Sequence, residues 1–135
     1  MSKLKEKSEF NFQAAQLLIS KNLYAPSVHC SYYGCFQLLK FTINNFFGVD
    51  YEKLSQLIAS NTLSTHAFVI KYVSDEIRTN LGRDSYREFN NKIKDLKNFR
   101  EESDYDNVEI SLDKGEKAFL FANEIRLFLS KNFHV

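Results

Sequence analysis

The segment from Pro26 to Phe47 constrains the fold of this chain most, because it is apolar nearly all round when drawn as a helix. One side of that helix would carry Val28, Tyr32, Cys35, Leu39 and Ile43, and much of the rest would carry Tyr33, Phe36, Phe46 and Phe47. A helix that is apolar on all sides must be covered on all sides. Pro26 suits a first helical turn and Gly48 suits a stop. The sequence therefore predicts a central helix surrounded by others.

Helical periodicity continues through most of the chain. Long helices are expected at 4–21, 26–47, 84–103 and 111–132, with shorter ones at 51–59 and 66–77. The core face of the first is predicted to carry Phe10, Ala14, Leu17 and Leu18, and that of the last Ala118, Phe121, Ala122, Ile125, Phe128 and Leu129. No segment requires a β-strand. We expect an all-α, up-and-down bundle of four to five helices.

Length and charge limit the possible functions. A chain of 135 residues can bury one core, so a single domain over 1–135 is expected. Lysine and arginine number 18 against 17 acidic residues, so no overall field of either sign favours nucleic acid or membrane. Any recognition by charge must be local. No apolar run is long enough to span a bilayer, and no signal segment is evident, so a cytoplasmic location is expected.

Most signatures of metal and cofactor chemistry are missing. There is no Gly-rich phosphate loop, no nucleophile elbow and no zinc-binding pattern. His29, His66 and His134 are far apart in the sequence. Cys30 and Cys35 fall on different sides of one helix and are expected to be reduced thiols. We expect neither a bound metal nor a cofactor.

Arg100 is the residue of greatest chemical interest, because it ends the apolar stripe formed by Tyr86, Phe89, Ile93 and Leu96. A guanidinium at that position needs partners or must face a groove. In a structural interpretation it pairs with Asp104, four residues on, with Tyr105 packed over the pair. In a functional interpretation it faces a cleft and binds a phosphate or a nucleotide. Both interpretations remain open from the sequence.

Charge changes sign at Arg100. Residues 83–100 contain six basic and three acidic residues, whereas 101–116 contain seven acidic and one basic. The acidic segment would repel a phosphate chain, but it could contact a basic partner protein. The pair Tyr32 and Tyr33 is predicted to belong to the core more than to a platform for stacked bases.

Three blocks of residues in this chain are similar to the motifs of one known family. The first is LYAPSVHCSYYGCF at 23–36, where a tyrosine pair precedes a small residue and a Phe. The second, THAFVI at 65–70, is similar to the family's Thr-His-Ser segment. The third, FREESDYD at 99–106, is similar to its Arg-x-x-x-Asp-Tyr block and is followed by a last helix with Ala118 and Ala122. Together they span roughly residues 10–128 in the family's order and at similar spacing, and the chain therefore resembles the HEPN family (higher eukaryotes and prokaryotes nucleotide-binding).

The resemblance implies a helical bundle that pairs as a homodimer, with polar residues in a cleft near the pairing surface. It implies candidate binding residues Arg100, Asp104, Tyr105, His66, Tyr32 and Tyr33. It also implies a minimal nucleotidyltransferase as a partner, in a pair resembling toxin and antitoxin. The aromatic content, 13 Phe and 7 Tyr, independently favours a self-complementary face and hence a homodimer.

In the nuclease branch of the family the Arg is followed, after four to six intervening residues, by a His, and this chain has Asp104 and Tyr105 near that place. Metal-free RNA cleavage needs a base and an acid, which a His supplies near neutral pH. We therefore favour a non-catalytic or weakly active module that binds a nucleotide, RNA or a nucleotidyltransferase. The alternative is a metal-independent endoribonuclease with Arg100, His66 and Tyr105 as candidate catalytic residues.

Overall fold

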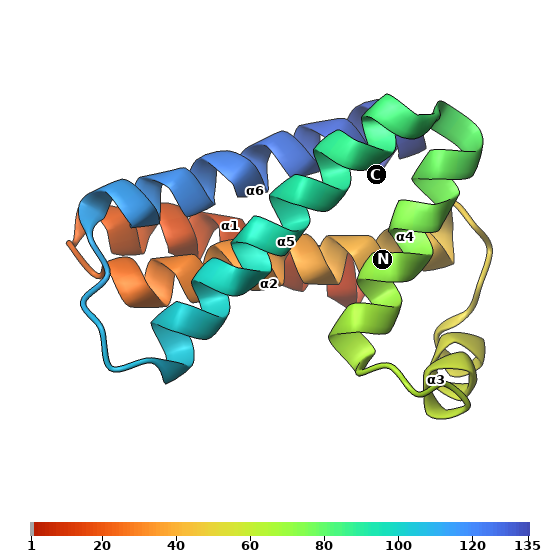
Figure 1. The fold of residues 1–135 in the computed structure, drawn as a ribbon, viewed down its shortest axis with the longest axis horizontal. Coiled ribbons are helices and arrows are strands. Elements are labelled where there is room, and N and C mark those ends of the chain that lie inside the picture. The colour runs from red at the N-terminus through yellow and green to blue at the C-terminus, as the bar shows by residue number, and fades with distance from the viewer. Residues whose placement is uncertain (1) are drawn as a thin grey trace.

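The computed structural model describes residues 2–135, which form six helices (Figure 1). These are α1 Lys3–Ser20, α2 Tyr24–Asn45, α3 Tyr51–Ala59, α4 Thr65–Leu81, α5 Arg83–Tyr105 and α6 Leu112–Phe133. The described residues contain no strand. The predicted all-α bundle is confirmed: five of its helices have 17 residues or more, and α3, with 9, is an additional short one.

The helix ends follow local signals in the sequence. Four helices begin after a side chain that accepts a hydrogen bond from the backbone N–H three residues on, and these N-cap residues are Ser2, Asp50, Ser64 and Ser111. Gly82 separates α4 from α5 with a φ of +94°, in the left-handed region that glycine tolerates best. The predicted helix over 66–77 extends four residues further, to Leu81, because it has no stop signal before that glycine.

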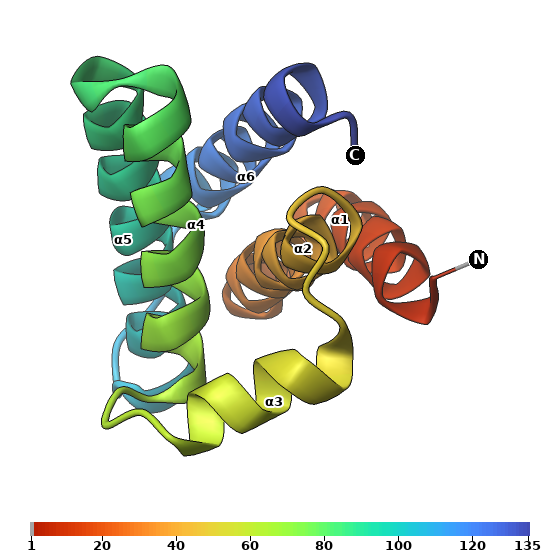
Figure 2. The ribbon, with the colours of Figure 1, turned by 90° about the vertical axis from the view of Figure 1, so that its right-hand side faces the viewer.

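Helix α2 is the central helix, as predicted, and it packs against α1, α4, α5 and α6. In Figure 2, α1 and α2 lie side by side and are viewed nearly along their axes, while α4 and α5 stand side by side across them. The short α3 leads from the α1 and α2 side to the base of α4 (Figure 2). The far end of α2, the start of α1 and α3 therefore come together at one side of the molecule.

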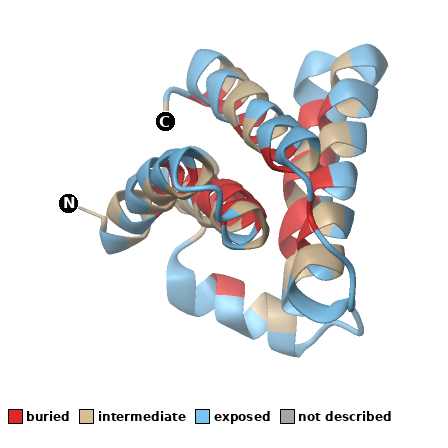
Figure 3. Cartoon of the chain, turned by 90° about the vertical axis from the view of Figure 1, so that its left-hand side faces the viewer, coloured by how far each residue is buried: buried red, intermediate tan, exposed pale blue. Residues whose placement is uncertain are grey.

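The core lies on the faces that the helices turn toward α2 (Figure 3). Its fully buried large side chains include Tyr32, Leu39, Ile43, Leu54, Ile77, Ile93, Leu96, Ile125, Leu129 and Phe133. Cys30 and Cys35 are free thiols, as predicted. Over residues 2–135, no helix is both long enough and apolar enough to cross a membrane.

The predicted core face of α1 was wrong. Phe10 and Leu17 are 58% and 61% exposed, whereas the buried residues of this helix are Ser8, Phe12 and Ala15. The reason is the close approach of α1 to α2 at Gly34: the Ser8 hydroxyl donates to the Gly34 carbonyl at 2.6 Å, and a Cβ added to Gly34 would lie 3.2 Å from the Phe12 ring. This close contact turns the face with Ser8, Phe12 and Ala15 toward α2, so Phe10 and Leu17 point outward.

Candidate functional site

Arg100 lies on the core side of α5, where it ends the predicted apolar stripe. It is only 6% exposed. Its guanidinium carbon lies 5.0 Å from the ring centre of Tyr32, 5.5 Å from that of Tyr33 and 5.6 Å from that of Tyr105. Ring faces attract a cation, and they do so most strongly where water is excluded. Two rings from α2 and one from α5 thus hold the buried charge in place.

The hydrogen-bonding capacity of Arg100 is not fully used. Its Nη1 donates to the Tyr105 hydroxyl at 3.2 Å, and the nearest carboxylate oxygen, Oδ2 of Asp104, is 3.7 Å from Nη1. The buried Nε finds no acceptor among the described residues. The Arg100–Asp104 pair of the structural interpretation is therefore present, but it is loose. A guanidinium donor is left without a protein partner, which is costly in a buried position.

Asp104 has a closer partner in His29. The Nδ1 atom of His29 lies 2.8 Å from Oδ2 of Asp104, and the two side chains are 47% and 20% exposed. The His29 ring also packs against Tyr33, with 4.6 Å between ring centres. The sequence does not indicate this pair, because the two residues are 75 positions apart. The available signal was the spacing of four between His29 and Tyr33, which puts both on one face of α2.

His66, at the start of α4, closes the other side of the cluster. Its Nδ1 lies 2.7 Å from the Tyr32 hydroxyl, and its ring stacks on Phe36 with 4.2 Å between centres. Burial, followed by the positive charges of Arg100 and Lys97, lowers the pKa of His66 below its usual 6.5. The protein therefore favours the uncharged imidazole at this position.

The lowered pKa of His66 predicts a pH dependence of stability. At pH values above about 6.5 the imidazole is neutral in both the folded and the unfolded chain. As the pH falls below that value, the unfolded chain takes up the proton first, so the free energy of unfolding should decrease. In His66→Gln this contribution should be absent. Urea unfolding of both proteins at about pH 7.5 and about pH 5.5 checks this, and equal pH slopes would contradict it.

Tyr32 links Arg100 to His66, because its ring faces one and its hydroxyl bonds the other. It is fully buried, so the prediction that it belongs to the core is confirmed, while Tyr33 is partly exposed. Burial raises the pKa of Tyr32 above its usual 10, although the nearby Arg100 opposes this. The phenol is therefore neutral and serves as a hydrogen-bonding group instead of a base.

The six residues predicted as candidates, Arg100, Asp104, Tyr105, His66, Tyr32 and Tyr33, thus form one contiguous cluster, and His29 joins them. The cluster combines a fixed cation, an aromatic lining and a half-exposed imidazole paired with a carboxylate. Among the residues that the structure describes, no group of His, Cys, Asp and Glu side chains is arranged to hold a metal ion. Such an arrangement offers hydrogen-bond donors and positive charge, which are the requirements for binding a phosphate group.

Comparison with known proteins agrees with the family resemblance seen in the sequence. A family model described as HEPN domain matches residues 1–132. None of the curated proteins and none of the solved structures compared with the chain matches it.

Proposed function

Because this chain belongs to the HEPN domain family, we propose that it is a binding module whose Arg100 cluster holds a phosphate group of a nucleotide or an RNA strand. One observation carries the proposal: three tyrosine rings fix the guanidinium of Arg100, while its Nε has no protein acceptor. A phosphate oxygen is a strong acceptor for such a donor.

The side chain of Tyr105 lies between Arg100 and solvent, so a phosphate reaches Arg100 when this side chain moves away. It is 74% exposed, whereas Tyr32, on the other side of the guanidinium, is fully buried. Movement of the Tyr105 side chain toward solvent frees Nη1, which then donates to the phosphate in place of the phenol. The exposed ring remains available to pack against a base.

The shifted pKa values of His66 and Tyr32 support binding of RNA without cleavage. Metal-free cleavage of RNA needs a group that accepts the 2′-hydroxyl proton and one that protonates the leaving oxygen. The lowered pKa of His66 makes it a poor proton donor near neutral pH, and its Nδ1 is already engaged by Tyr32. The raised pKa of Tyr32 excludes this phenol as a base at that pH.

A specific observation favours the second candidate, a metal-independent endoribonuclease. The carboxylate of Asp104 holds His29 by Nδ1, so the opposite ring nitrogen is oriented and the half-exposed imidazole lies beside the Arg100 cluster. Carboxylates orient catalytic histidines in this way in many hydrolases. In this alternative, His29 would take the catalytic position that was assigned to His66 from the sequence.

Incubation with RNA separates the two candidates. Purified protein, single-stranded RNA and structured RNA are mixed with a chelator present, and the products are resolved on a gel. We expect bound but intact RNA. Cleavage by the wild type that disappears in both His29→Ala and Arg100→Met would replace the binding proposal by the nuclease. Cleavage that persists in both variants would identify a contaminating nuclease.

We also propose that the protein forms a homodimer. Large apolar side chains are exposed on α1 and α6, at Phe10, Leu17, Leu120 and Leu127, all at least 54% exposed. Exposed apolar side chains of this size are common in protein interfaces. Light scattering at micromolar concentration measures the state directly, and a monomer would contradict the dimer.

A nucleotidyltransferase partner is proposed from the family membership and from the surface around residues 101–116. This segment is acidic and also exposes Tyr105, Val108 and Leu112. An apolar centre with acidic surroundings complements a partner with a basic rim. A nucleotidyltransferase gene beside this one, and co-purification of the two products, would support a two-component system resembling toxin and antitoxin.

A further inference from the structure

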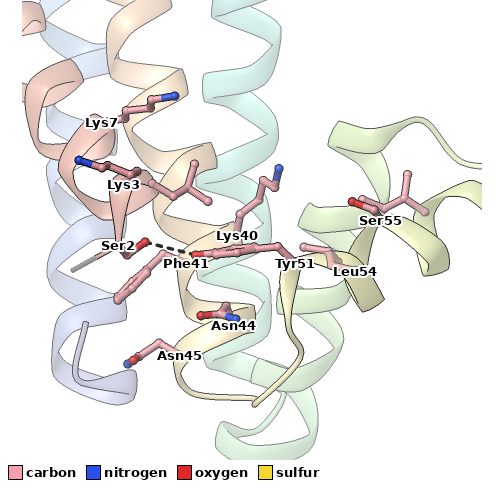
Figure 4. Close-up of a pocket in the computed structure, with 12 residues that line it drawn as sticks. Ser2, Lys3, Lys7, Lys40, Phe41, Asn44, Asn45, Tyr51, Leu54 and Ser55 are labelled. Atoms are coloured by element: carbon pink, nitrogen blue, oxygen red, sulfur yellow. Dashed lines mark hydrogen bonds between the residues drawn. The ribbon is translucent and has the colours of Figure 1, made fainter.

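A groove of about 820 Å³ lies between the start of α1, the end of α2 and the short α3 (Figure 4). Three lysines line it: Lys3 and Lys7 from α1, and Lys40 from α2. The groove also contains the hydroxyls of Ser2 and Tyr51, which are 3.4 Å apart. None of its lining residues is acidic. The groove therefore offers donors and positive charge to a ligand.

The charges of the three lysines are not neutralised within the protein. Elsewhere in residues 2–135, Lys71, Lys92, Lys97 and Lys114 form ion pairs with carboxylates, but Lys3, Lys7 and Lys40 form none. The acidic residues that follow the starts of α1 and α3, Glu6 and Glu52, do not line the groove. Unpaired ammonium groups on both walls of one groove attract anionic groups such as phosphates.

Part of the groove's lining is apolar. Phe41, Leu54 and Ile58 contribute to it, and Tyr51, which also lines the groove, is 37% exposed. Aromatic side chains under a basic rim are the usual means by which proteins bind single-stranded nucleic acids, because every base can stack on them whatever its identity. A free phosphate ion has no base that could stack on the aromatic side chains. The composition of the groove therefore favours a nucleotide chain.

The groove lies on the same side of α2 as the Arg100 cluster. Lys40 follows Tyr33 by seven residues, which is close to two helical turns and places it on the same face about 10 Å further along the axis. The charge of Lys40 also reaches the cluster, since it is among the causes that lower the pKa of His66. One extended ligand can therefore contact both the groove and the Arg100 cluster.

We propose that the groove binds successive phosphates of a single-stranded RNA that extends from the Arg100 cluster past Lys40 to Lys7 and Lys3. This inference rests on the proposed function, since it takes Arg100 as one contact of the strand. It adds that the ligand is a strand of several nucleotides and that α1 and α3 take part in binding it.

Fluorescence anisotropy with labelled RNA oligomers of about 4 and about 16 nucleotides tests the inference, because known single-strand sites cover this range. The triple variant Lys3→Gln, Lys7→Gln, Lys40→Gln should bind the long oligomer at least about tenfold more weakly. The slope of log affinity against log salt should become shallower by about 0.7 for each lost phosphate contact. Affinity for the short oligomer should be unchanged.

A matched control changes three exposed lysines outside the groove to Gln: Lys21, Lys117 and Lys131. It removes the same total charge, so a general electrostatic effect would weaken binding equally in both triple variants and would overturn the inference. Equal affinity of the groove variant and the wild type for the long oligomer would also overturn it. The inference would also be overturned if inorganic phosphate displaced the long oligomer from the groove at the concentration expected to compete with a single phosphate contact.

The outcomes for the two proposals are distinct. Arg100→Met should weaken both oligomers, whereas the lysine variant should weaken only the long one. If Arg100→Met has no effect while the lysine variant does, the Arg100 site is refuted and the groove alone binds RNA. If only Arg100→Met has an effect, the groove is refuted. Circular dichroism of each variant, compared with the wild type, ensures that a loss of binding does not come from unfolding.

Discussion

Arg100→Met is expected to weaken binding of single-stranded RNA by about 10- to 150-fold and to leave the melting temperature unchanged or higher. The loss corresponds to one charge-assisted hydrogen bond, about 1.5 to 3 kcal/mol. Methionine fills a similar space among the tyrosine rings and removes the buried Nε that has no protein acceptor. Replacing a buried charge by an apolar group of similar volume is often neutral or stabilising. Asp104 keeps its closer partner, His29.

The control for this prediction is Arg100→Lys, which retains the charge but loses the planar fork of donors. Its RNA affinity should lie between those of the wild type and Arg100→Met. Anisotropy titrations and thermal melts of the three proteins measure both effects. A drop in stability of more than about 2 kcal/mol in Arg100→Met, with unchanged RNA affinity, would make Arg100 a structural residue only.

Leu39→Ala is expected to cause a large loss of stability, about 2 to 5 kcal/mol. Leu39 is fully buried on α2, which is packed on four sides by other helices, so the surroundings cannot easily close the cavity. Such a loss is a large part of the stability of a typical domain, about 5 to 15 kcal/mol. Urea unfolding measures it, and the same helix carries Tyr32 and Tyr33, so RNA affinity should fall when the variant begins to unfold.

The matched control for Leu39→Ala is Leu23→Ala, the same substitution at a residue that is 50% exposed. Leu23 precedes α2 and makes no side-chain cap, and alanine is an equally poor cap, so the helix start is not altered. The expected loss is about 1 kcal/mol or less. Equal losses in the two variants would contradict the assignment of Leu39 to the core.

The helices themselves follow from local patterns that a single sequence displays. The boundaries of α3 agree with the prediction residue for residue, because Asp50 caps its start and a polar stretch follows its end. The central place of α2 could be predicted since a helix that is apolar on all sides has no stable position at the surface. The position of Arg100 on the core side of α5 also followed from periodicity, because it falls on the stripe of Ile93 and Leu96.

The face of α1 could not be predicted in the same way. Phe10 and Leu17 point outward, and the tight contact of Ser8 and Phe12 with Gly34 decides which side is buried. That contact joins residues 26 apart, and a hydrophobic pattern within one helix contains no information about the partner's shape.

Part of the candidate site could be predicted from the sequence, and the rest depends on the tertiary structure. Periodicity placed Arg100 on the apolar stripe of α5, and its spacing of four from Asp104 makes these two residues neighbours on one helix whatever the rest of the fold. Only the tertiary structure brought His29 to Asp104, across 75 positions, and His66 to Tyr32, across 34. The same holds for the lysine groove, whose walls come from three helices. Local sequence determines which side chains a helix presents, and the packing of helices against one another decides which of them meet.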